Sequence, residues 1–570
     1  MLLNNTRALI IIFAVTCGLF AHSVDQRAPW FGAIDTGLHE WLTGSTVKFA
    51  KNWYREGPVN LKFLMLEEPS SVEFPMLEDR GVYQSYAPGS VLPVYLIAKI
   101  IGRPPSAAMV MRYNLLNHFG IAFLLAMASY FLLFKLGVAR GLATALSIVP
   151  AGLQLNMGAP MYWHQNVYFS DQAVILFFAG IITLEVFRED VRNTKYATVF
   201  ALLYAVVSFY GTLVDWFFVV VLFVIFLKRC VLMEFGKSVI VWGRGVSLFC
   251  LPPALALGLF SLQFGSPLQM LNGLSGIAAL RSESIEISQE FSIGFNERIW
   301  QHLIPYGYGE NASFVLLVAF FGLVLVGFEL IRRGIHKSAS KAFRKVWVYL
   351  VLSLVPCLMH IYLLQNHSWI HDFSVLKFAV FLSIGPFLLV PALCFYVCRE
   401  RMKVGMPAFV NLNLLKAAGL SLLVLLFICM VSFIEQANAR AIHFFAFKQP
   451  REYLLIGSLL EAEATYQDIV FSPHIEIPNA PPIMLSYSMK RVYYRPDIHD
   501  LNAHIDQFSS RLGEDGFSTS ILIDERMKST LSDPHEGTIQ PVSISIKPLM
   551  IVKRELYWQL YVRQFNQGSS

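Results

Sequence analysis

The chain has 570 residues, of which 55% are hydrophobic and only 15% charged, and its mean hydropathy is +0.53. Soluble proteins carry about 25% charged residues because their surface faces water, so this composition excludes a soluble globular protein. The net charge of +6 comes from short basic clusters between apolar runs, which is typical of membrane proteins and argues against a nucleic-acid binder.

The first apolar run, residues 8–21, follows Arg7 and suits either a cleaved signal peptide or a signal-anchor helix. We favour the anchor, because many apolar runs follow that must also be threaded through the membrane. Residues 25–109 then form the predicted first outer loop. Within this loop, residues 86–101 are apolar but contain prolines and are shorter than the roughly 20 residues that a bilayer requires. We therefore predict a helix that lies on the membrane surface.

Apolar runs of spanning length dominate the chain up to residue 434. They predict helices at 110–134, 141–158, 170–187, 196–212, 214–228, 245–264, 311–331, 346–364, 373–397 and 411–434. The pair at 196–228 has one long bent helix as its alternative. Together with the first run, the pattern predicts a polytopic α-helical membrane domain, residues 1–434, with about eleven spans.

The positions of the basic residues support this topology. Lysines and arginines gather in the loops that it places inside, which are 135–140, 188–195, 228–244, 332–345 and 399–403. The short outer loops 159–169 and 365–372 contain neither lysine nor arginine. This asymmetry follows the positive-inside rule and predicts a multi-pass protein of the plasma (inner) membrane with its C-terminus outside.

The C-terminal region, residues 435–570, is more polar and has a different periodicity. Strands are predicted at 468–472, 491–494 and 520–524, and helices at 453–460 and 498–512. Because strands and helices alternate, we predict a soluble extracytoplasmic α/β domain.

Ionisable and polar groups near the outer membrane surface are costly and mark candidate functional sites. Asp35, just after the first span, suits a general base that receives the proton of an acceptor hydroxyl, but the local sequence by itself favours a helix N-cap formed by Asp35 and Thr36. The candidates for substrate binding are Tyr86, Arg112, His164, Asp171, Arg298, His367, His371, Asp372 and Lys377.

Several of these candidates have structural alternatives. Asp171 can cap the helix that it begins, and Lys377 can extend to the interface instead of binding a lipid phosphate. The histidines of loop 365–372 can bind a metal or phosphate, but a loop does not place them on one helix face. The outer loop 265–310 is mostly without periodic structure and offers Arg281, Arg298 and His302 as anion-binding groups.

Three segments resemble the GT-C glycosyltransferases, in the branch of the protein O-mannosyltransferases and the lipid A aminoarabinose transferases. Tyr86-Ala87-Pro88-Gly89-Ser90, continued to Gly102, resembles a tyrosine-proline-proline helix of that branch, with Ala87 in place of the first proline. Arg112-Tyr113-Asn114-Leu115-Leu116 resembles the start of its second span, and His371-Asp372-Phe373 resembles a late histidine-rich outer loop. The resemblance covers roughly residues 1–430.

The resemblance implies that a polyprenyl-phosphate-linked sugar is transferred, with inversion, to a glycan, lipid or protein hydroxyl. Asp35 would be the base, and Arg112, Arg298, His371 or Lys377 would hold the leaving phosphate. Many members have two adjacent acidic residues in the first loop, whereas Thr36 follows Asp35 here. A divalent metal cofactor is left open, no nucleic-acid partner is expected, and the alternative functions are a transporter or flippase and a non-catalytic envelope assembly protein.

Overall fold

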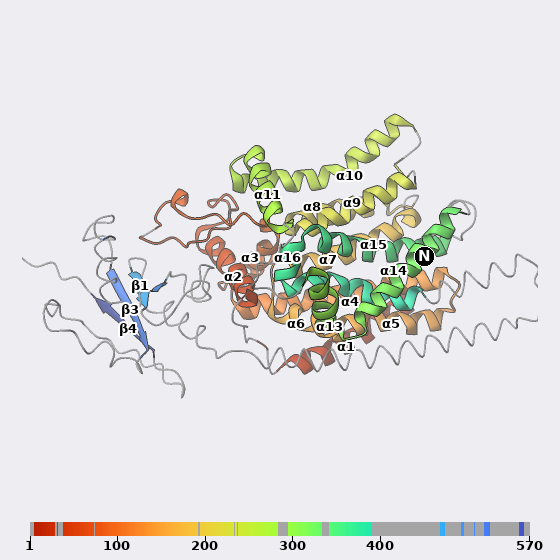
Figure 1. Cartoon of the computed structure of the whole chain (residues 1–570), viewed down its shortest axis with the longest axis horizontal. Helices are drawn as coiled ribbons and strands as arrows, with labels where there is room; N and C mark the ends of the chain where they lie inside the picture. Colours follow the sequence, from red (N-terminus) through yellow and green to blue (C-terminus); the bar gives the residue numbers. More distant parts are fainter. Residues whose placement is uncertain are drawn as a thin grey trace, which may run out of the picture. The chain divides into compact units, whose positions relative to one another are not determined.

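We describe the protein from a computed structural model, shown in Figure 1. The structure describes residues 5–389, except 29–30, 32–37, 73, 192–193, 233, 236–237, 283–293 and 333–340. Beyond residue 389 it describes residue 507 and four strands. The chain divides into two compact units: residues 1–32, 85–90 and 111–447 form the first, and residues 33–84, 91–110 and 448–570 form the second.

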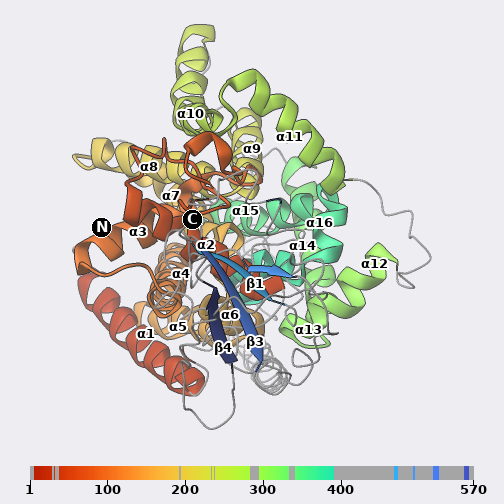
Figure 2. The same ribbon diagram turned by 90° about the vertical axis from the view of Figure 1, so that its left-hand side faces the viewer.

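The first unit is a bundle of apolar helices. Its α-helices are α1 (Thr6–Arg27), α4 (Ala107–Lys135, from residue 111), α5 (Arg140–Asn156), α6 (Gly158–Asn166), α7 (Ser170–Val191), α8 (Ala197–Val214), α9 (Trp216–Val231), α10 (Val239–Phe260), α11 (Pro267–Ser282), α12 (Phe295–Glu297), α13 (Ile304–Tyr308), α14 (Ala312–Arg332), α15 (Lys341–Leu363) and α16 (Gln365–Ile370). Tighter or wider turns form η4 (Pro88–Ser90), η5 (Ser261–Phe264), η6 (Arg298–Leu303) and η7 (Asp372–Lys377). Helices α7, α8, α9 and α15 pack together, whereas α1 lies at the edge of the bundle (Figures 1 and 2).

The lengths of these helices confirm a multi-pass membrane protein. Among the described residues, seven helices are long and apolar enough to cross a membrane, or up to nine if each of two bent pairs is one span. The predicted span 411–434 and part of 373–397 lie outside the described residues, so the total of about eleven stays a prediction.

Two local predictions near the spans have clear outcomes. The segment Pro88–Ile101 is a short apolar helix, too short to cross the membrane, as the sequence predicted. Between α8 and α9 the chain becomes extended at Asp215, whose carboxylate accepts a 2.6 Å hydrogen bond from the Phe217 backbone N–H. The residues 196–228 therefore form two helices, because this cap starts a new one.

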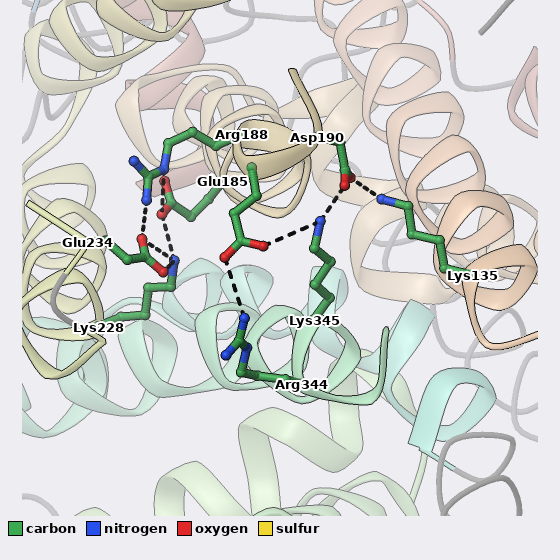
Figure 3. A network of polar contacts seen from close by, with 9 residues as sticks. Lys135, Glu185, Arg188, Asp190, Lys228, Glu234, Arg344 and Lys345 are labelled. Carbon is green, nitrogen blue, oxygen red and sulfur yellow. Dashed lines mark hydrogen bonds and ion pairs between the residues drawn. The ribbon is translucent and has the colours of Figure 1, made fainter. Parts of the chain in front are cut away.

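At one end of the bundle, basic residues of the predicted inner loops join acidic residues of α7 in a network of ion pairs (Figure 3). Glu185, fully buried, accepts from Arg229 at 2.7 Å and from Lys228 at 2.9 Å. Lys345 of α15 is 2.8 Å from Asp190, which also pairs with Lys135 of α4. The network thus joins the ends of four helices.

The second unit contains α2 (Leu38–Glu56), α3 (Val91–Ile101), the short turn η3 (Leu77–Asp79) and a sheet. In α2, the apolar side chains of Leu42, Phe49 and Trp53 are buried. Trp53 Nε1 donates a 2.8 Å hydrogen bond to the Leu64 carbonyl.

The sheet has four strands in the order β2-β1-β3-β4. They are β1 (Asp468–Ser472), β2 (Val492–Tyr494), β3 (Ser518–Asp524) and β4 (Trp558–Arg563). β1 is parallel to β2 and β3, and β4 is antiparallel to β3. Three strands were predicted and β4 was not; the predicted helix 453–460 and all of 498–512 except residue 507 lie outside the described residues.

Candidate functional site

Asp171 and Lys377 form a buried ion pair between the first turn of α7 and the end of η7. The Lys377 Nζ is 2.5 Å from Asp171 Oδ1, and the two side chains are only 1% and 2% exposed. Removing both charges from water is costly, and ionisable groups inside a membrane bundle are rare unless they have a function. This pair is therefore the starting point of the candidate site.

Tyr86 and Arg281 extend the site from the first outer loop and from α11. The Tyr86 hydroxyl donates a 3.3 Å hydrogen bond to the second oxygen of Asp171. The Arg281 guanidinium lies over the Tyr86 ring, 4.8 Å from its centre. Each partner of the contact between Tyr86 and Asp171 thus has a positive group next to it, Arg281 at Tyr86 and Lys377 at Asp171.

The segment that carries Tyr86 is held tightly in place. Trp216 Nε1 donates to the Ser85 carbonyl at 2.9 Å, and the Tyr210 hydroxyl donates to the Gly89 carbonyl at 2.8 Å. A Cβ at Gly89 would lie 2.5 Å from the Leu213 carbonyl oxygen, so only glycine permits this close approach.

Two histidines complete a group that has the donor set of a metal site. Ligand atoms of Asp171, His360 and His367 all lie within 4.8 Å of one another. His360 Nδ1 and His367 Nε2 are buried, and neither atom has a hydrogen-bond partner among the described residues. One carboxylate and two imidazoles are typical zinc ligands, so these residues fit a divalent metal.

The protonation state of His367 suits this role. Burial holds the pKa of His367 well below its usual range, against the opposing effect of Asp171. The imidazole is therefore neutral at pH 7, and a neutral imidazole is the form that binds a metal.

Two expectations about this region need correction. Residues 365–370 form the short helix α16, not a loop, and loop 265–310 contains α11, α12, η6 and α13. The apolar residues of α11, which has 16 residues, do not gather on one face, and the other helices are too short to show a period. Sequence periodicity therefore does not reveal them. His360 was missed because it lies in the apolar run of α15; its only sequence signal is a histidine at membrane depth.

The other predicted residues lie apart from this group or next to it. The His371 ring is 4.4 Å from that of His367, whereas Asp372 faces a hollow that Arg298 also lines. Arg112 is exposed, with its guanidinium 5.7 Å from the centre of the Phe31 ring. Asp35 lies outside the described residues.

His164 belongs to a second buried cluster. Its Nδ1 is 3.3 Å from Asn114 Oδ1, and its ring stacks on His118 at 4.7 Å. Arg27, at the end of α1, reaches His118 at 3.4 Å and donates to the Met161 carbonyl at 2.9 Å. The described contacts of His164 are therefore within this cluster and not with Asp171.

The fold and site define a multi-pass membrane protein with a buried carboxylate–lysine–histidine centre. Solved structures of similar fold include the archaeal oligosaccharyltransferase AglB from Archaeoglobus fulgidus with an inhibitory peptide and a dolichol-phosphate: the TM-score is 0.52 and the identity 8%, over 90% of this chain and 70% of that chain. The A. fulgidus oligosaccharyltransferase complex with Zn and sulfate has a TM-score of 0.50 at 10% identity, over 91% of this chain and 68% of that chain.

ArnT from Cupriavidus metallidurans bound to undecaprenyl phosphate aligns over 97% of this chain and 98% of that chain, with 10% identity and a TM-score of 0.48. No protein-family model and no curated protein matches the sequence. The predicted resemblance to the GT-C glycosyltransferases is thus confirmed for the fold, through AglB.

Proposed function

We propose that the protein is a glycosyltransferase that takes its sugar from a polyprenyl-phosphate carrier at the outer face of the membrane. The observation that supports this most is the buried Asp171–Lys377 pair with Tyr86 and Arg281 around it, in a fold shared with an oligosaccharyltransferase. The phosphate of a lipid carrier lies at the membrane surface, so an enzyme that uses it needs cations at that level to bind the negative charge.

In the proposed reaction, the acceptor hydroxyl oxygen attacks the anomeric carbon of the sugar, and Asp35 takes the hydroxyl proton. The bond between that carbon and the phosphate oxygen breaks, and polyprenyl phosphate leaves with its electron pair. Attack from the opposite face inverts the anomeric centre.

Negative charge grows on the phosphate oxygens as the bond breaks, so cations that face these oxygens lower the barrier. Lys377 and Arg281 take this role in the proposal, with Arg112 and His371 as further candidates. Tyr86 orients Asp171 and thereby Lys377. A divalent metal bound by Asp171, His360 and His367 would supply additional positive charge beside the phosphate.

Donor binding is the first test of the proposal. Purified protein in nanodiscs is titrated with dolichol phosphate and, separately, with dolichol. We expect the phosphate to bind at least tenfold more tightly, and we expect Arg281→Gln and Lys377→Met to remove this preference. Lys195→Met, at an exposed lysine of the loop before α8, should keep it. Equal binding of both lipids to the unchanged protein would refute a phosphate site.

Sugar transfer is the second test. Mass spectrometry compares the envelope glycans of cells with and without the gene, and of cells with Asp35→Asn or the control Asp25→Asn, at an exposed residue of α1. We expect the glycan product to disappear in cells without the gene and in cells with Asp35→Asn, and to remain in cells with Asp25→Asn. Transport of a lipid-linked sugar without any covalent product would favour a flippase, and retained product in Asp35→Asn would remove the proposed base.

A further inference from the structure

A hollow lined by both polar and apolar side chains lies in the first unit, next to the start of η7. Its volume is about 840 Å³, and the residues that line it include Arg298, Trp300, His302, Tyr306, Glu310 and Asp372. Such a volume is within the range of small-molecule sites, and a lining of aromatic rings with a few polar groups is typical of them.

The wall of the hollow is a π-helix, η6, followed by a sharp bend. The helical segments Phe295–Tyr308 and Ala312–Val324 meet at 110°, and Gly309 at the bend has a φ of 94°. Short π-helical turns are rare in proteins as a whole, but those that occur are often at functional sites, because they displace side chains from the regular helix face.

The wall is also firmly attached to its surroundings. The Tyr308 hydroxyl donates to the carbonyls of Val375 at 2.9 Å and Leu376 at 3.2 Å. Trp300 Nε1 donates to the Tyr362 hydroxyl at 3.0 Å. These bonds fix the wall before any ligand binds, which reduces the entropic cost of binding.

The charges of the lining indicate which ligand it suits. One guanidinium, that of Arg298, is accompanied by the two carboxylates of Glu310 and Asp372. This balance opposes a polyanion such as a lipid phosphate. It suits a neutral molecule with many hydroxyl groups, which can donate to carboxylates, accept from the guanidinium and lay its C–H faces on Trp300 and Tyr306.

The hollow shares two structural elements with the ion-pair site. The Arg298 guanidinium lies 5.6 Å from the centre of the Trp369 ring, on the same short helix, α16, that carries His367. Asp372 begins η7, and Lys377 ends it. A ligand in the hollow is therefore close to the segment that holds the buried lysine.

We propose that this hollow binds the acceptor, and that the acceptor is a saccharide or carries one at its reacting end. The role of this ligand as acceptor rests on the proposed transferase function, whereas saccharide binding in the hollow can be measured independently of that function. Arg298 then recognises acceptor hydroxyls and not the phosphate of the donor.

Saturation-transfer NMR with full-length protein in nanodiscs tests the proposal. The probes are neutral trisaccharides (maltotriose, cellotriose and N,N′,N″-triacetylchitotriose) and, in parallel, serine- and threonine-containing tripeptides. We expect at least one trisaccharide to bind and the peptides not to bind. Tyr306→Ala and Glu310→Ala should weaken that binding at least tenfold, whereas Asp25→Asn, on an exposed carboxylate of α1 outside the lining, should leave it unchanged.

Dolichol phosphate binding is measured on the same samples and should be equal in all four proteins. Absence of trisaccharide binding, unchanged binding in both hollow variants, or binding of peptides alone overturns the proposal. Loss of dolichol phosphate binding in Tyr306→Ala and Glu310→Ala also overturns it, because the hollow would then hold the donor. Saccharide binding without any dolichol phosphate binding would leave the hollow assigned while the proposed transferase function fails.

Discussion

Replacing Glu185 by glutamine removes the carboxylate that pairs with Arg188, Lys228 and Arg229 in the inner ion-pair network. The Glu185 side chain is 0% exposed and holds Arg229, which is 8% exposed, through both carboxylate oxygens at 3.2 and 2.7 Å. The Arg229 guanidinium also lies over the rings of Tyr204 and Phe249, 4.8 and 4.7 Å from their centres. It therefore has little room to reach water when the carboxylate is removed.

The expected loss follows from this burial. Breaking a buried ion pair by removing one partner costs about 3–5 kcal/mol, because the remaining charge stays uncompensated. Lys228 retains Glu234 at 2.6 Å, so Arg229 bears most of the loss. We expect the free energy of unfolding of Glu185→Gln, measured by denaturant titration in mixed micelles, to fall by about 3–5 kcal/mol.

Glu189→Gln is the matched control. Glu189 is on the same helix but is 31% exposed, and it lies 3.7 Å from Arg344 and 3.9 Å from Lys345. Such a half-exposed pair contributes about 0–1 kcal/mol. The double variant Glu185→Gln/Arg229→Met should recover part of the loss, because no buried charge is then left alone. Equal effects of Glu185→Gln and Glu189→Gln, or a double variant as unstable as the sum of the single ones, would refute the reasoning.

Three further predictions concern other parts of the chain. Gly89→Ala should destabilise the first unit by about 1–3 kcal/mol, because the added methyl group meets the Leu213 backbone, whereas Gly18→Ala, with open space around it, should not; thermal unfolding measures both. Burial lowers the pKa of Lys48 in the folded protein below the 10.5 of the unfolded chain, against the opposing effect of Glu67. At a pH between the folded and the unfolded pKa, the unfolded chain therefore binds more protons than the folded protein. Stability contributed by this residue should then rise with pH towards 10.5, and Lys48→Met should remove that rise in a series of melting temperatures. Zinc added to metal-free protein should bind and raise the melting temperature; His360→Ala should abolish this effect, and unchanged zinc binding in the variant would exclude the proposed triad.

The sequence alone determined most of the membrane architecture. A span requires a continuous run of apolar residues of fixed length, so the runs behind α1, α4, α7 and α10 identify these helices without any tertiary information. For the same reason the short segment Pro88–Ile101 could be excluded as a span. Strands β1, β2 and β3 were found because β-branched and aromatic residues are concentrated in short runs.

Tertiary structure alone decided the site. Asp171 and Lys377 are 206 residues apart, and no spacing in the sequence indicates that their helix ends meet. His360 lies within an apolar span, where the sequence does not distinguish a packed histidine from a ligand. Hydropathy records how each residue partitions between water and lipid, whereas ion pairs and ligand sets depend on which helix faces adjoin, and only packing sets that arrangement.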